Sequence, residues 1–272
     1  MVRSLWTAAT GMIAQQTNMD TIANNLANVN TTGYKTQTNE FKSLLYQNLQ
    51  TRTTTANGAQ KPTGAQVGLG VRSASITTNF TEGSLQGTES STDFALDGTG
   101  FFAVQGRDGQ TYYTRNGNFK FTLAPGGGNM LANSQGYPVI DTNGKPIVLD
   151  ERYTISNVTV TADGTICYPD EKNNAQSLGI QIGVFQFNNP RGLSREGDSL
   201  YAQTANSGAP MNEATNSNLQ KTSVIQGYLE MSNVQVVDEM VNMITTQRAY
   251  ELNSKAITTT DTMLDVANNL KR

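Results

Sequence analysis

Histidine is absent from all 272 residues, so the chain lacks the side chain that most often serves as a general base and as a metal ligand. Its single cysteine, Cys167, excludes an intramolecular disulfide and is expected to be a small buried side chain. No apolar run approaches the roughly 18 residues that a membrane-spanning helix needs. The first residues also lack the basic stretch and apolar run of a cleaved secretory signal. We therefore expect no enzyme, no cofactor, no catalytic or metal site and no membrane insertion.

Charge is also scarce. Charged residues make up 15% of the chain, against about a quarter in a typical protein, and the net charge is -3. No basic patch argues for a nucleic-acid partner. Thr, Asn, Gln, Ser and Gly take the place of charged residues, and such a surface suits contact between copies of one chain as well as a secreted β-protein. Composition alone does not decide between these two classes.

The N-terminal segment carries a seven-residue apolar repeat. A second row lies three residues after the first, and only Gln15 interrupts it. This is the a/d pattern of a coiled coil, and it predicts a helix over residues 4–30, about 40 Å long, with Ser4 as a possible N-cap and Gly33 as its stop. The two rows are Leu5, Met12, Met19 and Leu26, and Ala8, Gln15, Ile22 and Val29.

The C-terminal segment has the same repeat, at Val236, Met243, Tyr250, Ile257 and Leu264, and a neighbouring row at Ala249, Ala256, Met263 and Leu270 widens it. It predicts a helix over residues 234–270, with Ser232 or Asn233 as its cap. One such stripe alone favours an ordinary amphipathic helix on a globular core. Two stripes at opposite ends of the chain favour a terminal coiled coil, and whether the helices pair within or between chains stays open.

The middle of the chain is rich in predicted strands. Apolar residues alternate at Leu178, Ile180, Ile182 and Val184, which is typical of antiparallel β structure. Hairpin turns are predicted at Asp108-Gly109, Asn116-Gly117, Asn143-Gly144 and Asp163-Gly164. Asp141-Thr142-Asn143-Gly144 is expected to be such a turn rather than a calcium loop, because its glycine is at the fourth place and no glutamate closes it.

The segment between the first helix and this region is harder to interpret. Residues 40–49 could form a short helix, since Phe41, Leu44, Leu45 and Leu49 would share one face. Residues 50–70 favour either a flexible linker or an extended hairpin ordered by neighbours. The predicted fold class is α+β: terminal helices 1–33 and 228–272 forming a coiled coil, an extended linker or hairpin over 34–75, and an antiparallel β-rich central domain over 76–227.

Three groups of residues resemble a known family. Ile22–Val29 with Thr32-Gly33-Tyr34-Lys35, and Val241–Ile244 with Gln247–Glu251 and Lys255–Ile257, resemble the N- and C-terminal motifs of bacterial flagellar rod and hook proteins. Asp97–Phe102 and Tyr113–Gly117 are similar to the hallmark of that family's β domain. The family motif positions are Asn24, Asn25, Leu26, Asn28, Gly33, Tyr34, Gln247, Arg248, Ala249 and Tyr250.

The resemblance implies a structural subunit of the flagellar basal body. The length and the 45–71 segment are most similar to members that build the distal rod, a hollow helical polymer transmitting torque from motor to hook. It implies export across the cytoplasmic membrane by the flagellar export apparatus, with copies of itself, proximal rod proteins, hook protein and bushing rings as partners. The assembly interface would be Leu5, Met12, Met19, Ile22, Leu26, Val29, Val236, Met243, Tyr250, Ile257 and Leu264. Alternatives are a proximal rod or hook-type subunit, a phage tail or adhesin component, and a secreted enzyme using paired carboxylates on polysaccharide.

Overall fold

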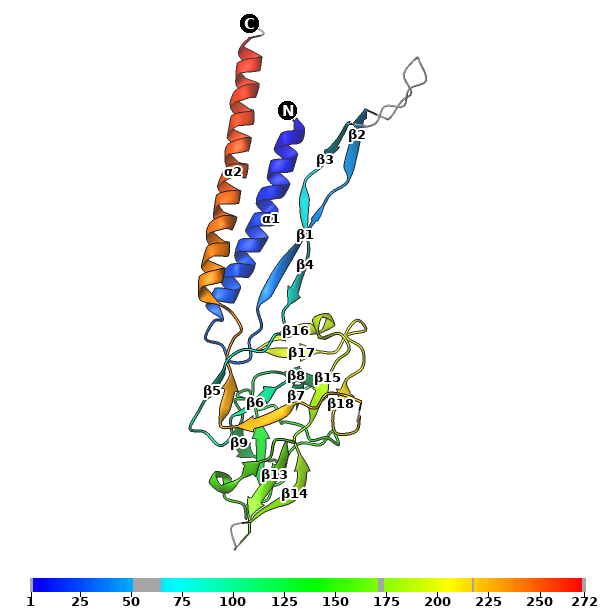
Figure 1. Ribbon diagram of the computed structural model, residues 1–272, viewed down its shortest axis with the longest axis vertical. Coiled ribbons are helices and arrows are strands. Elements are labelled where there is room, and N and C mark those ends of the chain that lie inside the picture. Colours follow the sequence, from blue (N-terminus) through cyan, green and yellow to red (C-terminus); the bar gives the residue numbers. More distant parts are fainter. Residues whose placement is uncertain (1, 51–64, 171–173, 217, 271–272) are drawn as a thin grey trace. The chain divides into compact units, whose positions relative to one another are not determined.

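A computed structural model describes residues 2–50, 65–170, 174–216 and 218–270. The chain divides into two compact units, which are described separately below. The first contains residues 1–27, 37–78 and 235–272, and the second contains residues 28–36 and 79–234. A helix at each end and a β-rich region between them confirm the predicted α+β class (Figure 1). No helix in the described part of the chain is both long and apolar enough to cross a membrane.

Two antiparallel helices form most of the first unit. They are α1 (Val2–Ala27) and α2 (Val236–Asn269), which pack side by side (Figure 1). The two predicted terminal helices are therefore confirmed, but the predicted caps are wrong. Ser4 lies inside α1, and α2 begins after Gln235, which makes no side-chain capping hydrogen bond.

The end of α1 also differs from the prediction. The Thr31 hydroxyl donates to the side-chain oxygen of Asn28, and the Thr31 amide donates to the Asn28 carbonyl, both at 3.1 Å. These bonds form a local turn in place of a further turn of helix. Val29, predicted as the last residue of the apolar seam, consequently lies outside the helix and in the second unit. Gly33 has a left-handed φ of 68° but lies well beyond the last helical residue, so it does not stop α1.

A two-part antiparallel hairpin completes the first unit. Its strands are β1 (Gln37–Ser43), β2 (Tyr46–Gln50), β3 (Ala65–Gly68) and β4 (Val71–Thr78), with β1 paired to β4 and β2 to β3. The helix predicted over 40–49 is wrong, because these residues pair with a partner strand distant in sequence. The described arms form the hairpin alternative, while residues 51–64, at the centre of the ambiguous segment, lie outside the described residues.

Short antiparallel strands build the second unit. Its largest sheet has six strands in the order β16-β17-β8-β7-β15-β18. The strands are β5 (Leu85–Gly87), β6 (Phe94–Asp97), β7 (Phe101–Gln105), β8 (Thr111–Thr114), β9 (Lys120–Leu123), β10 (Asn129–Ala132), β11 (Val148–Leu149), β12 (Thr159–Val160), β13 (Thr165–Pro169), β14 (Ala175–Gln181), β15 (Val184–Gln186), β16 (Ser194–Gly197), β17 (Leu200–Ala202), β18 (Met211–Asn212), β19 (Ser223–Gln226) and β20 (Tyr228–Glu230). Two short 3-10 helices, η1 (Ile155–Asn157) and η2 (Pro190–Gly192), lie between strands.

The core of this unit agrees with the predicted alternation. Ile182 and Val184 are buried in its main apolar cluster, and Leu178 and Ile180 pack against that cluster. Cys167 is buried, as predicted. The 141–144 turn is confirmed, since the Asp141 carboxylate accepts hydrogen bonds from the backbone of Asn143 and Lys145, both at 2.8 Å.

Candidate assembly site

Three charged side chains from distant parts of the sequence meet inside the β-rich unit. Lys35, Arg115 and Glu230 are each at most 1% exposed. The Lys35 ammonium donates to Glu230 Oε1 and, at 2.7 Å, to the Thr81 carbonyl. Arg115 Nη1 donates to Glu230 Oε2 at 3.3 Å. One carboxylate therefore holds two cations in a dry interior, where an unpaired charge would be costly.

Neighbouring groups complete this ion-pair cluster. The Gly83 amide donates to Glu230 Oε1 at 2.9 Å, and the Arg115 guanidinium lies over the Phe101 ring, 5.2 Å from its centroid. Burial lowers the pKa of Lys35, and the charge of Glu230 opposes that shift. The cluster serves to stabilise the fold, because both oxygens of the Glu230 carboxylate already accept hydrogen bonds from within the unit.

Gly33 brings the N-terminal segment up to this cluster. Its amide donates to the Glu230 carbonyl at 2.8 Å, and its left-handed φ favours glycine. A Cβ at this position would lie 2.5 Å from the backbone nitrogen of Asn116, so only glycine permits the approach. Thr32 and Asn116 also bond through their side chains at 3.0 Å. The family motifs around residues 33 and 115 thus meet in one place.

The contact between α1 and α2 is more polar than the apolar stripes predict. Polar or small residues spaced seven apart along α1 each face a polar residue of α2, and these partners are also spaced seven apart, in the opposite direction. Asn18 Nδ2 donates to Thr246 Oγ1 at 2.9 Å, and a Cβ on Gly11 would lie 2.9 Å from Asn253. The pairs, from the C-terminal end of α1 toward its N-terminus, are Asn25 with Glu239, Asn18 with Thr246, and Gly11 with Asn253. This polar ladder fixes the register of the two helices.

Asn25, a family motif residue, joins three elements of the first unit. It is 1% exposed, and its amide exchanges two hydrogen bonds with the backbone of Gln37 in β1, at 2.8 and 2.9 Å. It also hydrogen-bonds the carboxylate of Glu239 in α2, which lowers the pKa of that group against the larger raising effect of burial. One side chain therefore ties α1 to both β1 and α2. Sequence reasoning named Asn25 but not this role.

The predicted seam residues are only partly covered within the chain. Ile22 is buried, whereas Val236 and Tyr250 are 40% and 39% exposed. In the neighbouring row of α2, Ala256, Met263 and Leu270 are exposed, so within the chain that row does not widen the covered stripe. The remaining seam residues are half-buried: Leu5, Met12, Met19, Leu26, Met243, Ile257 and Leu264. Of the other motif residues, Asn24, Gln247 and Arg248 are exposed, and Asn28, Tyr34 and Ala249 are half-buried.

Many of the large apolar side chains of α2 are exposed. Throughout α2, all of which is described, the only buried residues are the polar Glu239 and Thr246. Nine of its large apolar side chains are exposed: Val236, Val237, Met240, Val241, Ile244, Tyr250, Leu252, Met263 and Val266. Trp6 and Ile13 of α1 are also exposed, at 69% and 66%.

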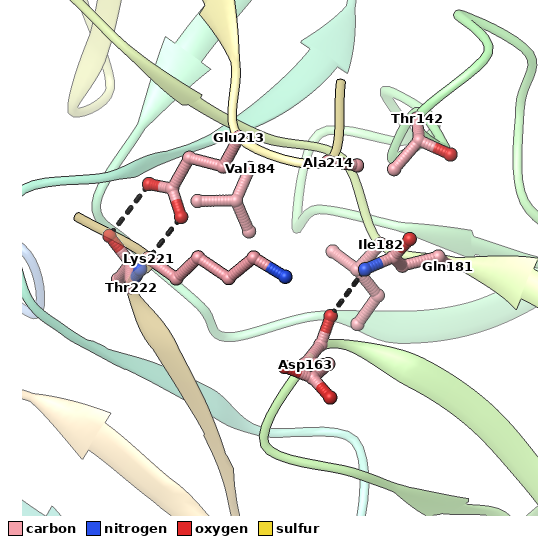
Figure 2. Close-up of a pocket in the computed structure, with 9 residues that line it drawn as sticks. All are labelled: Thr142, Asp163, Gln181, Ile182, Val184, Glu213, Ala214, Lys221 and Thr222. Atoms are coloured by element: carbon pink, nitrogen blue, oxygen red, sulfur yellow. Dashed lines mark hydrogen bonds between the residues drawn. The ribbon is translucent and has the colours of Figure 1, made fainter. Parts of the chain in front are cut away.

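A small pocket in the β-rich unit contains two acidic residues, Glu213 and Asp163 (Figure 2). Its volume is about 30 Å³, which is room for about one water molecule. The Glu213 carboxylate accepts two hydrogen bonds from Thr222, both at 2.7 Å (Figure 2). It accepts a third from Gln186 at 2.8 Å. Figure 2 also shows the Asp163 backbone carbonyl accepting from Gln181, at 2.6 Å. These bonds hold the loop before β19 in place, and the pocket is too small for a sugar ring.

Comparison with known proteins identifies the family. Three family models match successive parts of the chain: "Flagella basal body rod protein" over residues 5–35, "Flagellar hook protein FlgE/F/G D1 domain" over 95–168 and "Flagellar basal body rod FlgEFG protein C-terminal" over 225–270. The flagellar basal-body rod protein FlgG of Borreliella burgdorferi is 44% identical over 274 residues, covering all of both chains. The chain belongs to the flagellar basal-body rod protein family.

Other members of the family match over almost the same length. FlgG of Buchnera aphidicola from Acyrthosiphon pisum is 40% identical over 99% of this chain and 100% of its own, and FlgG of Bacillus subtilis is 35% identical over the whole of both. The flagellar hook-basal body complex protein FlhP of Bacillus subtilis is 34% identical over the whole of both. The matched N- and C-terminal models cover most of α1 and α2, the elements with the exposed apolar surface.

Proposed function

We propose that the chain is a structural subunit of the flagellar distal rod. Copies would polymerise helically into a hollow shaft that transmits torque from the motor to the hook. The observation that carries this proposal is the exposed apolar surface of α2. All 34 residues of this helix are described, and the only two that are buried are polar. An isolated molecule leaves that surface in water, whereas a neighbouring copy would cover it.

The terminal helices would form a coiled coil that neighbouring subunits complete. The half-buried seam of Leu5, Met12, Met19 and Leu26, together with Met243, Ile257 and Leu264, supplies the apolar rows, and the polar ladder supplies the register. A helical polymer requires a head-to-tail contact between different surfaces of identical chains. For this role the terminal residues 1–33 and 228–272 act as the assembly domain, with 34–75 as an extended segment and 76–227 as the central domain.

The partners follow from this role. They are copies of the same chain, proximal rod proteins at one end, hook protein at the other, the flagellar export apparatus and the bushing rings. The subunit would be located in the basal body after export across the cytoplasmic membrane. It would act as a structural protein and not as an enzyme. Among the described residues, the acidic pocket supports this view, because both oxygens of the Glu213 carboxylate already accept hydrogen bonds, from Thr222 and from Gln186 of β15.

Self-association of the purified full-length chain tests the proposal. Sedimentation velocity should show association that increases with concentration, and electron microscopy should show straight tubes. The single tryptophan, Trp6, is 69% exposed on α1, so its emission should shift to the blue as the tubes form. A chain that stays monomeric at every concentration, without any shift in Trp6 emission, would contradict the proposal.

A further inference from the structure

A polar cavity of about 280 Å³ opens within the first unit, between α1, β1 and the first turns of α2. Liquid water occupies about 30 Å³ per molecule, so the cavity could hold far more than one water. Asn18 lines it from α1, Asn39 from β1, and Glu239, Asn242 and Thr245 from α2. No lysine or arginine lines it among the described residues.

Two buried polar atoms, each on a residue that lines this cavity, lack a hydrogen-bond partner within the described structure. They are Glu239 Oε2 and Asn39 Nδ2. Glu239 is only 7% exposed, and Asn39 is held in place because its side-chain oxygen accepts a bond from Ser73. Buried polar groups in folded proteins nearly always have partners. A carboxylate oxygen and an amide N–H, on two residues that line one cavity, are therefore without a partner in the described structure.

The missing group should carry positive charge and several donors. Asn25 forms a hydrogen bond with the Glu239 carboxylate. The Oε2 atom of that carboxylate has neither a cation nor a donor among the described residues. Burial raises the pKa of Glu239, since the charged form loses its hydration. A guanidinium or ammonium group would restore a partner to the charged form, and a guanidinium offers five N–H donors in a planar array.

The hairpin of this same chain carries cations that lack acidic partners. Lys42 of β1 and Arg72 of β4 are directly opposite each other in the antiparallel register. Both side chains are exposed, and neither forms an ion pair with a described residue. Like charges directly opposite across two strands destabilise the pairing. An acidic group brought by another molecule would relieve that repulsion.

We propose that the cavity at Glu239 and Asn39 receives the cationic hairpin pair of a second copy of this chain, with Arg72 as the inserted side chain. The inference rests on the proposed polymer and adds a specific contact to it. Insertion would place the guanidinium against Glu239 Oε2, and a backbone or side-chain oxygen of the entering strand would accept from Asn39 Nδ2. Such a contact joins two different surfaces of identical chains and therefore propagates instead of closing.

Charge-neutralising variants of the full-length chain test the contact. Glu239→Gln keeps the size of the side chain and removes its charge, and it should raise the concentration needed for assembly at least about tenfold. Asp238→Asn is the matched control, because Asp238 is an exposed acid in the same helical turn and should change that concentration less than about twofold. Combining Glu239→Lys with Arg72→Glu should assemble better than either single variant. Assembly of Glu239→Gln at the wild-type concentration would overturn the proposal and assign the cavity to solvent.

A disulfide test does not depend on the effect of these variants on folding. With Cys167 replaced by serine, one preparation carries Arg72→Cys and the other carries Thr245→Cys at the cavity. Mixed, assembled and mildly oxidised, they should give a disulfide between residues 72 and 245 of different chains, identified by mass spectrometry. Assembled material without that disulfide contradicts the inserted contact and leaves the polymer intact. A wild-type chain that never self-associates removes both the polymer and the contact.

Discussion

At the scale of single residues, Glu230 is the acidic residue of the buried ion-pair cluster in the β-rich unit. It binds Lys35, Arg115 and the Gly83 amide in a fully buried position. Glu230→Gln would leave two buried cations without a counter-charge, so we expect the free energy of unfolding to fall by about 3–5 kcal/mol. Chemical denaturation followed by circular dichroism measures this change.

The control for that variant is Asp150→Asn. Asp150 pairs with Arg152 at 3.2 Å, but their side chains are 54% and 85% exposed. Water screens such a pair, and its loss should lower the free energy of unfolding by less than about 1 kcal/mol. Equal effects of the two variants would contradict the assignment of Glu230 as the centre of a dry ion-pair cluster.

A second residue-scale prediction concerns alkaline pH. Burial raises the pKa of Tyr201 from its usual 10 to about 12. Because the folded pKa is the higher one, this phenol contributes stability that is complete below pH 10 and is lost as the pH rises through 12. Denaturation curves measured at a series of pH values give the unfolding free energy lost between pH 10 and 12. In Tyr201→Phe this loss should be smaller than in the wild type by up to about 3 kcal/mol. A loss as large in Tyr201→Phe as in the wild type would contradict this prediction.

Sequence alone predicted some of these residues and not others. Cys167 and the 141–144 turn depend on local chemistry, and both predictions are confirmed. The pairing of Lys35 with Glu230 joins residues 195 positions apart, and no local pattern in one sequence indicates such a contact. The same reason explains why Gly33 was interpreted as a helix stop, when its actual constraint is the backbone near Asn116.

At the scale of elements, the two helices were predictable because the seven-residue repeat that specifies them is local. An extended linker or hairpin was expected over 34–75, but residues 40–49 were interpreted as a short helix because their apolar spacing also fits one. Their pairing partners lie at 65–78. The polar ladder was missed for a different reason. A search for apolar rows passes over Gly11, Asn18 and Asn25, although they repeat with the same period of seven.

The apolar seam itself gives an element-scale prediction. Leu26 is half-buried in α1, and Leu26→Asp would place a charge where an assembled neighbour should cover it, at a desolvation cost of several kcal/mol. We expect assembly to be lost while the circular dichroism of the β-rich unit is kept. Ala23→Asp adds the same charge to an exposed position of the same helix and should still assemble. Normal tubes from Leu26→Asp would refute the seam assignment.

At the scale of the whole molecule, assembly and folding of the β-rich unit should be separable. Residues 28–36 belong to the second unit, so deletion of residues 1–27 removes α1 without touching the ion-pair cluster. We expect the truncated chain to retain a cooperative thermal unfolding transition by circular dichroism and to stay monomeric by sedimentation. Tubes formed by this truncated chain would show that α1 is dispensable for the polymer.

The central claim is that the surfaces of α1 and α2 are left incomplete in one chain and are completed by neighbouring copies. Amide hydrogen exchange of the full-length protein, measured as dilute monomer and as assembled tubes, tests it most directly. We predict that the amides of α1 and α2 exchange rapidly in the monomer and become strongly protected in the tubes, while those of the β-rich unit are protected in both. Equal protection of both helices in a monomer whose size does not change with concentration would contradict the account.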